Sequence, residues 1–380
     1  MRKPVVHHVI TRLIAGGAQE NTILSCQALR DRYEVLLIAG PPEGREGSLL
    51  EDARRRGIEV LVVEELVRPI APLRDAAAFA RLRGIFESGH PDIVHTHSSK
   101  AGILGRAAAW AAKVPVIIHT NHGLPFYEGQ PMAAQAAYWT LEKAASLVTD
   151  TVVCVGEEMR RKSIAARLGP PGRFEVVYSG IETERFLEAA DCRACLNIPA
   201  DVPVIGIVSR MATHKGHRYL VDAAPPGVHL LFVGDGEERE AIERQVAERG
   251  VPATFAGHVP PEAVPDLIAS MDVLVHPSIW EGLPRAAVQG LLAGRPVVAF
   301  DCDGAREVVL DGVTGRLVAP RSVEGLTLAI RELLARPDRG RSLGLAGRER
   351  VLRRFDWRAA GEQLATIYKG RLVAGTPRLG

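Results

Sequence analysis

Short apolar runs alternate with longer amphipathic segments along most of this sequence. The apolar runs are rich in Val and Ile, and the segments between them are rich in Ala and Arg. Buried parallel strands have the first pattern, and the crossovers that join them are usually helices. The rhythm therefore predicts an α/β chain with a parallel, doubly wound sheet. In the first half, the predicted strands are 5–10, 33–39, 58–63, 92–97, 114–120, 151–155 and 174–178, and the predicted helices are 18–30, 47–56, 74–88, 100–112, 131–146 and 157–168.

The same rhythm restarts after residue 200, beyond the polar, Gly-containing stretch YSGIETERF (178–186). A chain of 380 residues also suits two domains of ordinary size. We predict two Rossmann-like domains, 1–182 and 183–355, followed by a helix and tail at 356–380. In the second domain, the predicted strands are 202–208, 228–234, 253–257, 272–276 and 295–300, and the predicted helices are 215–224, 237–249, 261–269, 284–293 and 322–335, with 355–372 as the last helix.

Polar residues that follow the predicted strands are the candidates for a functional site. Ligands of doubly wound sheets bind beyond the carboxyl ends of the strands, so two facing sheets predict a cleft. Histidines are concentrated at these positions: His95, His97, His119, His122, His214, His217, His258 and His276. One such histidine is usually structural, but several of them predict a polar cleft. His122 precedes a glycine, and we expect it to bind a substrate hydroxyl or to stabilise developing charge.

Composition excludes several classes of protein. The chain has 47 Lys and Arg against 45 Asp and Glu, without the basic stripe typical of nucleic-acid-binding proteins. No run approaches the roughly 20 apolar residues of a membrane-spanning helix, and the N-terminus does not resemble a signal peptide. Five scattered cysteines indicate the reduced thiols of a cytoplasmic protein. Cys192 and Cys195 form a CxxC without a second pair, which disfavours a zinc or redox role.

Two loops carry residues that suit an anionic ligand. Gly16 and Gly17 precede a predicted helix and would let backbone N–H groups approach an anion, although a plain tight turn explains them equally well. Arg210 and Lys215 lie five residues apart in SRMATHKG, and a guanidinium fork with a point charge suits a diphosphate. The alternative is two solvated cations. Cations at a helix start oppose the helix dipole, which favours a bound anion there.

The stretch WEGLP (280–284) predicts a second anion site. Pro284 suits the first turn of a helix, so the amides of Gly282 and Leu283 can point at a phosphate. The carboxylate of Glu281 can accept hydrogen bonds from sugar hydroxyls, or it can simply cap the helix. Gln289 lies about two turns further along and would meet a different part of one extended ligand.

Two other motifs are assigned no ligand. GDGEERE (234–240) has Arg239 where a dinucleotide fingerprint has its last glycine, so a plain turn is the better interpretation. DCDG (301–304) contains a D-x-D pair that could hold a divalent metal, but its place in the second of two doubly wound domains disfavours that use.

Together these segments resemble the retaining glycosyltransferases of family 4, which have the GT-B fold. The resemblance covers nearly the whole chain, in the family's order. The HTHSSKAG…HTNHG block is similar to the bacterial branch that builds surface polysaccharides or lipid-linked glycans. The matching segments are GGAQ (16–19), HTHSSKAGILGR (95–106), HG (122–123), SRMATHKG (209–216), VGDG (233–236), HPSIWEGLP (276–284) and EVVLDGVTGRLV (307–318).

The resemblance implies a hexosyl- or N-acetylhexosaminyltransferase that needs no metal or other cofactor. The donor would be a nucleotide-sugar, commonly UDP-linked in this family, and the acceptor a glycan or a polyprenyl-linked glycan. The second domain would hold the donor, the first domain the acceptor, and the last helix would cross back onto the first domain. No nucleic-acid partner is implied.

The resemblance also assigns roles to individual residues. Arg210 and Lys215 would hold the diphosphate, and Glu281 would contact the donor sugar. His97, Ser98 and Lys100 are the candidate acceptor-binding residues. The remaining implied donor contacts are the amides of Gly282 and Leu283 to the phosphates, the backbone of Gly257, His258 and Val259 to the base, Gly16 and Gly17 over the diphosphate, and His122 near the sugar.

One position departs from the family pattern. The family usually has a second Glu, eight residues after the first, that binds the nucleotide ribose, and this chain has Gln289. An amide keeps an acceptor oxygen, but the charge-assisted part of the bond is lost. Donor affinity or nucleotide preference is therefore open. Two alternatives stay open as well: a GT-B nucleotide-sugar epimerase, and a non-catalytic nucleotide-sugar-binding subunit.

The segment 68–83 suggests peripheral contact with a membrane. It carries Arg68, Arg74, Arg81 and Arg83 against the single acid Asp75. On a helix these cations could lie on anionic lipid, and a solvated helix face is an equally good explanation. We expect a cytoplasmic protein that reaches the inner face of the cytoplasmic membrane, mainly because of the lipid-linked branch that the chain resembles.

Overall fold

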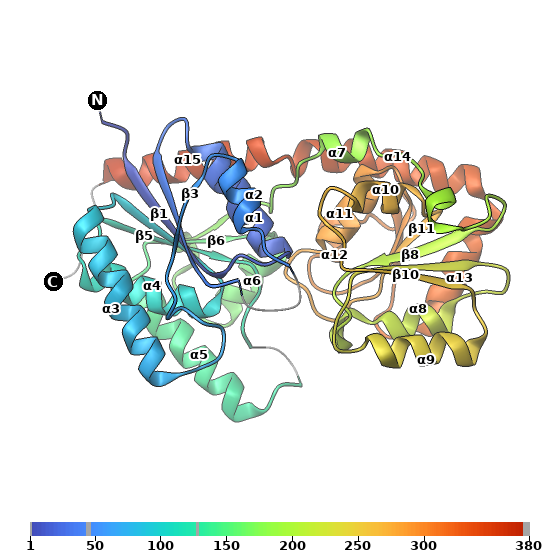
Figure 1. Cartoon of the computed structure of the whole chain (residues 1–380), viewed down its shortest axis with the longest axis horizontal. Helices are drawn as coiled ribbons and strands as arrows, with labels where there is room; N and C mark the ends of the chain where they lie inside the picture. Colours follow the sequence, from blue (N-terminus) through green and yellow to red (C-terminus); the bar gives the residue numbers. More distant parts are fainter. Residues whose placement is uncertain (1, 43–46, 127–128, 375–380) are drawn as a thin grey trace. The chain divides into compact units, whose positions relative to one another are not determined.

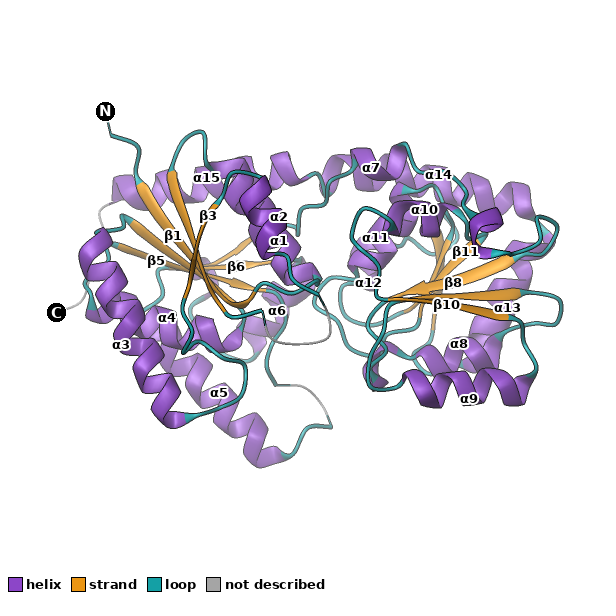
Figure 2. Ribbon diagram, in the orientation of Figure 1, coloured by secondary structure: helices purple, strands orange, loops and turns teal. Residues whose placement is uncertain are grey.

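The computed structural model describes residues 2–42, 47–126 and 129–374, and the chain divides into two compact units (Figure 1). The first unit runs to Ile181 and also includes the helix that begins at Trp357. The second unit is Glu182–Asp356, compared with 183–355 predicted from the sequence. Each unit is a parallel sheet covered by helices, as Figure 2 shows, and each is described below by itself.

The described part of the first unit contains a seven-stranded parallel sheet in the order β3-β2-β1-β4-β5-β6-β7. This is the doubly wound topology that the sequence predicts, and all seven predicted strands are present. The predicted helix at 47–56 is shorter, at Leu50–Arg55. The elements are β1 (Val5–Arg12), α1 (Gly17–Leu29), β2 (Glu34–Gly40), α2 (Leu50–Arg55), β3 (Glu59–Val62), α3 (Pro72–Gly89), β4 (Ile93–His97), α4 (Ser99–Ala111), β5 (Val116–Asn121), α5 (Met132–Leu147), β6 (Thr151–Cys154), α6 (Glu157–Ala165), η1 (Pro171–Arg173), β7 (Phe174–Val176) and α15 (Trp357–Ala374).

Alternate residues of the central strands face different helices, because successive side chains of a strand point to opposite faces. Val9 and Val94 pack with the side chains of α3 and α4. Val6 and Ile93 pack with Leu364 of α15 on the other face. The predicted return of the last helix to the first unit is therefore confirmed. The register sets His8 beside His95 across β1 and β4.

The second unit contains a six-stranded parallel sheet in the order β10-β9-β8-β11-β12-β13, counted over its described residues. Its five predicted strands are present, and β13 is an additional edge strand. The elements are α7 (Glu184–Leu187), η2 (Arg193–Leu196), β8 (Val204–Val208), η3 (Thr213–Lys215), α8 (His217–Ala223), β9 (His229–Val233), α9 (Arg239–Arg249), β10 (Ala253–Gly257), α10 (Val264–Ala269), β11 (Val273–His276), α11 (Arg285–Leu292), β12 (Val297–Phe300), α12 (Ala305–Val308), β13 (Gly315–Val318), α13 (Val323–Ala335) and α14 (Pro337–Arg354).

The sequence did not predict α14, and its glycines explain why. Glycine is a weak helix former, so Gly340, Gly344 and Gly347 weaken the helical pattern. In the structure two of them allow close packing. A Cβ at Gly344 would lie 2.2 Å from the carbonyl oxygen of Gly294, and one at Gly347 would lie 2.5 Å from Leu291. Close contact with α11 and its C-terminal turn outweighs the low propensity. None of the described helices is both long and apolar enough to span a membrane.

Candidate active site

Two loops of the second unit are joined at the carboxyl ends of β8 and β11. These neighbouring strands mark the point where the strand order reverses, the usual ligand position in doubly wound sheets. The amide of Ile279 donates to the carbonyl oxygen of His214 at 2.9 Å. The rings of His214 and Trp280 meet edge to face, with centroids 5.4 Å apart. The loop that carries Lys215 and the loop that carries Glu281 therefore form one structure.

The carboxylate of Glu281 is the centre of this structure. Its Oε1 lies 2.5 Å from Nζ of Lys215 and 3.1 Å from Nε2 of His276. Its backbone amide donates to Oδ2 of Asp303 at 2.6 Å. Burial by itself would raise the pKa of the Glu281 carboxyl, but the charge of Lys215 and the hydrogen bond from His276 outweigh it and hold this pKa well below its usual range. These contacts hold Glu281 in place as an ionised carboxylate at neutral pH.

Gly216 allows the Lys215 loop to approach the second loop. Its φ is +73°, in the left-handed region that glycine adopts easily, and a Cβ there would lie 2.1 Å from the carbonyl oxygen of Pro277. Arg210, at the start of the same loop, is exposed. Both predicted phosphate-binding cations thus lie at the sheet edge, and the structure adds that Lys215 is already paired with Glu281.

The start of α11 differs slightly from the prediction. Pro284 caps the helix, which begins at Arg285 instead of including the proline in its first turn. Gly282 is half-buried and Leu283 is buried just before this helix start, and Gln289 is half-buried within the helix.

The segment predicted to meet the base lies at the end of β10, whose last residue is Gly257. Gly257 has a φ of +69°, and its carbonyl oxygen accepts from the amide of Gly234 at 2.9 Å. His258 is exposed and Val259 is half-buried.

Both carboxylates of the D-x-D pair have protein partners. Asp301 forms an ion pair with Arg306 at 2.5 Å. Asp303 accepts from the backbone amide of Glu281, as described above. This use of Asp303 supports the Glu281 loop, a role that the sequence did not reveal.

The predicted anion-binding and acceptor-binding residues of the first unit occupy different environments. Gly16 precedes α1, which begins at Gly17. Oγ of Ser98 lies 2.7 Å from Oγ1 of Thr11. Nζ of Lys100 lies 2.5 Å from a carboxylate oxygen of Asp75, so this cation already has an acidic partner. In this conformation His97 is fully buried and does not present its ring to an acceptor.

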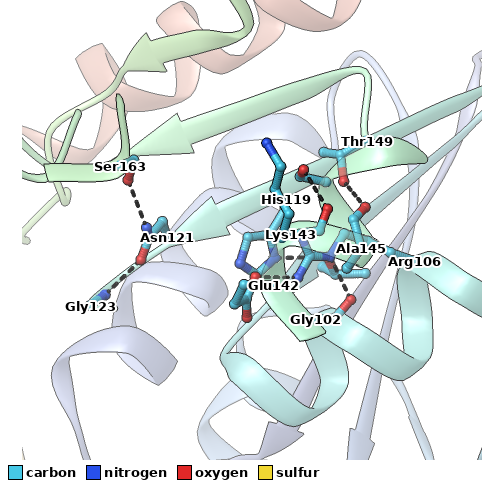
Figure 3. Close-up of polar contacts among 12 residues, drawn as sticks. Gly102, Arg106, His119, Asn121, Gly123, Glu142, Lys143, Ala145, Thr149 and Ser163 are labelled. Carbon is cyan, nitrogen blue, oxygen red and sulfur yellow. Dashed lines mark hydrogen bonds and ion pairs between the residues drawn. The ribbon is translucent and has the colours of Figure 1, made fainter. Parts of the chain in front are cut away.

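The turn that carries His122 is fixed on both sides. Asn121 accepts from the amide of Gly123 at 3.1 Å and donates to Oγ of Ser163 at 3.2 Å (Figure 3). His122 itself is half-buried, with Nε2 lying 3.1 Å from Nδ1 of His97. Asn121 therefore holds the turn that carries His122. The sequence did not reveal this contact, although Asn121 directly follows the predicted strand 114–120.

A buried ion pair joins α4 to α5 near this turn. Arg106 donates to Glu142 at 2.7 Å and to the carbonyl oxygen of Gly102 at 2.7 Å (Figure 3). A Cβ at Gly102 would lie 2.7 Å from the ring of His119, which explains this glycine. The GILGR end of the motif at 95–106 is therefore structural.

Among the described residues, one group of potential metal ligands is close enough together to hold an ion, and it consists of three buried histidines. Their ligand atoms all lie within 4.8 Å of one another. They are His8, His95 and His97.

The comparisons with known proteins match this architecture. Residues 15–185 match the model of Glycosyltransferase Family 4, and residues 190–350 match that of Glycosyl transferases group 1. A 2-deoxystreptamine glucosyltransferase of Streptomyces kanamyceticus is 30% identical over 353 residues, which cover 82% of this chain and 89% of the relative. The chain belongs to glycosyltransferase family 4.

Other matches of this family 4 glycosyltransferase cover most of both chains. A UDP-Gal:alpha-D-GlcNAc-diphosphoundecaprenol alpha-1,3-galactosyltransferase of Escherichia coli is 25% identical, covering 86% of each chain. Among solved structures, Anabaena Alr3699/HepE in complex with UDP and glucose superposes with a TM-score of 0.83 at 22% identity, covering 97% of this chain and 100% of that one. At this identity, the similarity to the Anabaena structure supports the GT-B fold and nothing more specific. The chain is thus an enzyme of glycan biosynthesis that uses a nucleotide-sugar donor.

Proposed function

We propose that this glycosyltransferase moves a hexosyl or N-acetylhexosaminyl group from a UDP-sugar to a glycan or lipid-linked acceptor, with retention of configuration and without a metal. The Escherichia coli relative, whose printed name includes UDP-Gal and a diphosphoundecaprenol acceptor, supports the two substrate classes. The observation that carries the proposal is the ionised Glu281, held between Lys215 and His276 at the switch point of the second sheet.

Lys215 can serve the donor without leaving Glu281. An ammonium group has three N–H donors, so one can stay on Oε1 of Glu281 while another meets a phosphate oxygen. Arg210 adds a guanidinium from the start of the same loop. These fixed cations would stabilise the diphosphate as it departs from an oxocarbenium-like centre, a role that a metal has in other transferases.

Glu281 fits a role in orientation better than one in proton transfer. A carboxylate whose pKa is held far below its ordinary value is a weak base. Among the described residues, the observed side-chain contacts of Glu281 use Oε1, so we assign Oε2 to the sugar hydroxyls. The proton of the acceptor hydroxyl would pass to an oxygen of the leaving phosphate on the same face, which gives retention.

The remaining donor contacts keep their predicted roles within this proposal. They are the amides of Gly282 and Leu283 for the phosphates, Gln289 for the ribose, the backbone of Gly257, His258 and Val259 for the base, Gly16 and Gly17 for the diphosphate, and His122 for the sugar.

A nucleotide-sugar panel tests the proposal. A donor present at 100 times its Kd stabilises a protein by about 2.7 kcal/mol, so a thermal-shift screen identifies the base and the sugar. Nucleotide release is then measured with and without acceptors. Release that depends on the acceptor supports transfer. An altered donor in the absence of acceptor would indicate an epimerase, and tight binding without turnover on any acceptor would indicate a binding subunit.

We also propose that the segment around the start of α3 rests on the inner face of the cytoplasmic membrane. Ile70 and Leu73 are 74% and 90% exposed. Exposed Arg68, Arg74 and Arg81 lie in the same stretch. The single acid, Asp75, is paired with Lys100. Apolar side chains beside cations suit an anionic lipid surface. Co-sedimentation with anionic vesicles should fall for Leu73→Glu, and equal binding to neutral vesicles would contradict the proposal.

A further inference from the structure

A continuous row of hydrogen-bonded side chains runs through the core of the first unit to His122. It starts at Thr120 of β5, passes through the hydroxyl of Tyr368 on α15, and ends at the half-buried ring of His122. The contacts are Thr120 Oγ1 to His95 Nε2 at 2.6 Å, His95 Nδ1 to Tyr368 Oη at 2.5 Å, Tyr368 Oη to His8 Nε2 at 3.4 Å, His8 Nδ1 to His97 Nε2 at 3.0 Å and His97 Nδ1 to His122 Nε2 at 3.1 Å.

The interior members of this row are neutral. His8, His95, His97 and Tyr368 have no exposed surface. Burial lowers the pKa of His8 to about 3 and holds the pKa values of His95 and His97 well below their ordinary value. Burial also raises the pKa of the Tyr368 hydroxyl well above its ordinary value, so this group keeps its proton. A neutral imidazole has one N–H donor and one acceptor nitrogen. The tautomer of each ring therefore fixes the tautomer of the next.

The ring geometry favours this hydrogen-bonded row over a metal site. The rings of His95 and His97 are stacked, with centroids 4.4 Å apart and planes 28° apart, and the planes of His8 and His97 differ by 15°. The planes of His8 and His95 differ by 38°. The lone pair of a ring nitrogen lies in the plane of its ring, so the lone pairs of His97 and of the two rings stacked on it lie in separate planes. All six ring nitrogens of His8, His95 and His97 also have hydrogen-bond partners already.

The hydroxyl of Thr120 can set the direction of the row. Its hydroxyl is buried and carries a hydrogen that needs an acceptor. Within the described part of the chain, the observed partner of this hydroxyl is Nε2 of His95. If Thr120 donates there, His95 donates through Nδ1 to Tyr368, and Tyr368 donates to His8. His8 then donates to His97, and His97 donates to Nε2 of His122. A neutral His122 must in that case carry its own proton on Nδ1.

We propose that this row is a positioning relay that holds His122 as the neutral Nδ1–H tautomer, and that Thr120 and Tyr368 are positioning residues for the sugar transfer. The inference rests on the proposed function, because it gives the His122 ring a donor N–H for a sugar hydroxyl or for developing negative charge. It also gives the C-terminal helix a role in the chemistry, since the hydroxyl of Tyr368 is linked to His122 through the buried histidines.

The tautomer of His122 can be read directly, without turnover. The full chain is labelled with ¹⁵N-histidine, and long-range ¹H–¹⁵N correlations distinguish an Nδ1–H ring from an Nε2–H ring. The signals of His122 are assigned by their loss in His122→Asn. We expect the Nδ1–H pattern in the parent protein and in Thr120→Ser, which keeps the hydroxyl. We expect a mixture of the two patterns in Thr120→Val and in Tyr368→Phe.

Tyr33→Phe is the matched control for Tyr368→Phe. The rings of Tyr33 and Tyr368 pack edge to face, with centroids 5.4 Å apart, and the Tyr33 hydroxyl donates to the carbonyl oxygen of Ala365. Tyr33→Phe therefore removes a hydroxyl from the same core without interrupting the row. Its His122 pattern should match the parent. An Nε2–H ring in the parent, or an unchanged pattern in both Thr120→Val and Tyr368→Phe, would overturn the relay. If Tyr368→Phe does not fold, the Thr120→Ser and Thr120→Val pair still decides.

Kinetics separate failure of the relay from failure of the proposed function. With a donor and acceptor found in the screen, Thr120→Val should lower kcat about tenfold, roughly the effect of one hydrogen bond, with the KM for the donor within about twofold. An equal loss in Tyr33→Phe would show that the effect is structural and would overturn the proposal. The tautomer result stands even if the reaction proves not to be sugar transfer.

Discussion

At the scale of single residues, the most informative contact is the ion pair between Lys215 and Glu281. Lys215→Met keeps most of the length of the side chain but removes the positive charge that we propose stabilises the leaving diphosphate. We predict that kcat falls by about 10²–10³, the usual cost of removing one preorganised electrostatic group. Steady-state nucleotide release measures this.

Arg316→Met is the control for Lys215→Met. Arg316 is a half-buried cation of the same unit that is paired with Asp311 and Glu332, and it is assigned no contact with the donor. The kcat of Arg316→Met should stay within about twofold of that of the parent enzyme. A Lys215→Met enzyme as active as this control would contradict the assignment of Lys215 to the leaving group.

Gln289 offers a second test at the residue scale. If its amide meets the ribose, Gln289→Glu restores a charge-assisted hydrogen bond, worth about 1 kcal/mol more than a neutral one. We predict that UDP binds roughly fivefold more tightly, measured by isothermal titration calorimetry. Gln289→Ala should weaken binding. Unchanged affinity in both variants would show that this position does not contact the nucleotide.

At the scale of elements, α14 provides a matched pair of glycines. A Cβ at Gly344 would lie 2.2 Å from a backbone oxygen, whereas one at Gly340 would meet its nearest atom at 3.5 Å. Alanine gains about 1 kcal/mol of helix propensity over glycine at either position. We predict that Gly340→Ala raises the free energy of unfolding by up to about 1 kcal/mol, and that Gly344→Ala lowers it by about 1–3 kcal/mol because the backbone must shift. Urea unfolding of each variant measures this, and equal effects would contradict the packing explanation.

The elements that the sequence predicted differ from those it missed in how regular their apolar pattern is. Runs such as residues 5–10 and 114–120 predicted their strands correctly because a parallel strand buried on both faces is mostly apolar. The short edge strand β13, with Arg316 among its four residues, lacks that pattern. The helix α14 lacks a clear helical pattern because glycines occupy positions where it packs against residues distant in the sequence. Local periodicity reports local burial and does not report such contacts.

Individual residues of the candidate site were predictable from the sequence, but most contacts between them were not. Lys215 and Glu281 were found because each follows a strand in a motif with known chemistry. The pairing between them, the support from Asp303 and the row from Thr120 through Tyr368 were not predicted. They depend on the order and register of strands far apart in the sequence, and on a helix that returns to the first unit after the second is complete.

At the scale of the whole molecule, the buried histidines predict a loss of stability in mild acid. Burial lowers the pKa of His7 and His217 to about 4 and of His8 to about 3, and holds those of His95, His97 and His119 well below 6.5. Between pH 6.5 and about 4 the unfolded chain therefore binds more protons than the folded one, so the free energy of unfolding falls as pH falls. Each such histidine contributes up to about 1.4 kcal/mol per pH unit in that window.

Urea unfolding at pH 7.5, 6.0 and 5.0 tests this prediction. Glu281 does not interfere, because its lowered pKa contributes stability that is lost only below the usual range of a carboxyl group. His7→Leu should reduce the slope of stability against pH by about one proton, since His7 is buried against Phe86. A stability that stays flat or rises on acidification would contradict the neutral state of these rings.

The proposed reaction transfers a sugar with retention of its anomeric configuration. The most direct measurement is the configuration of the new glycosidic bond, read by ¹H NMR of the product formed from the donor and acceptor found in the screen. From an α-linked UDP-sugar we predict an α-linked product. A β-linked product would contradict the same-face departure of the diphosphate at Lys215, and with it the proposed mechanism.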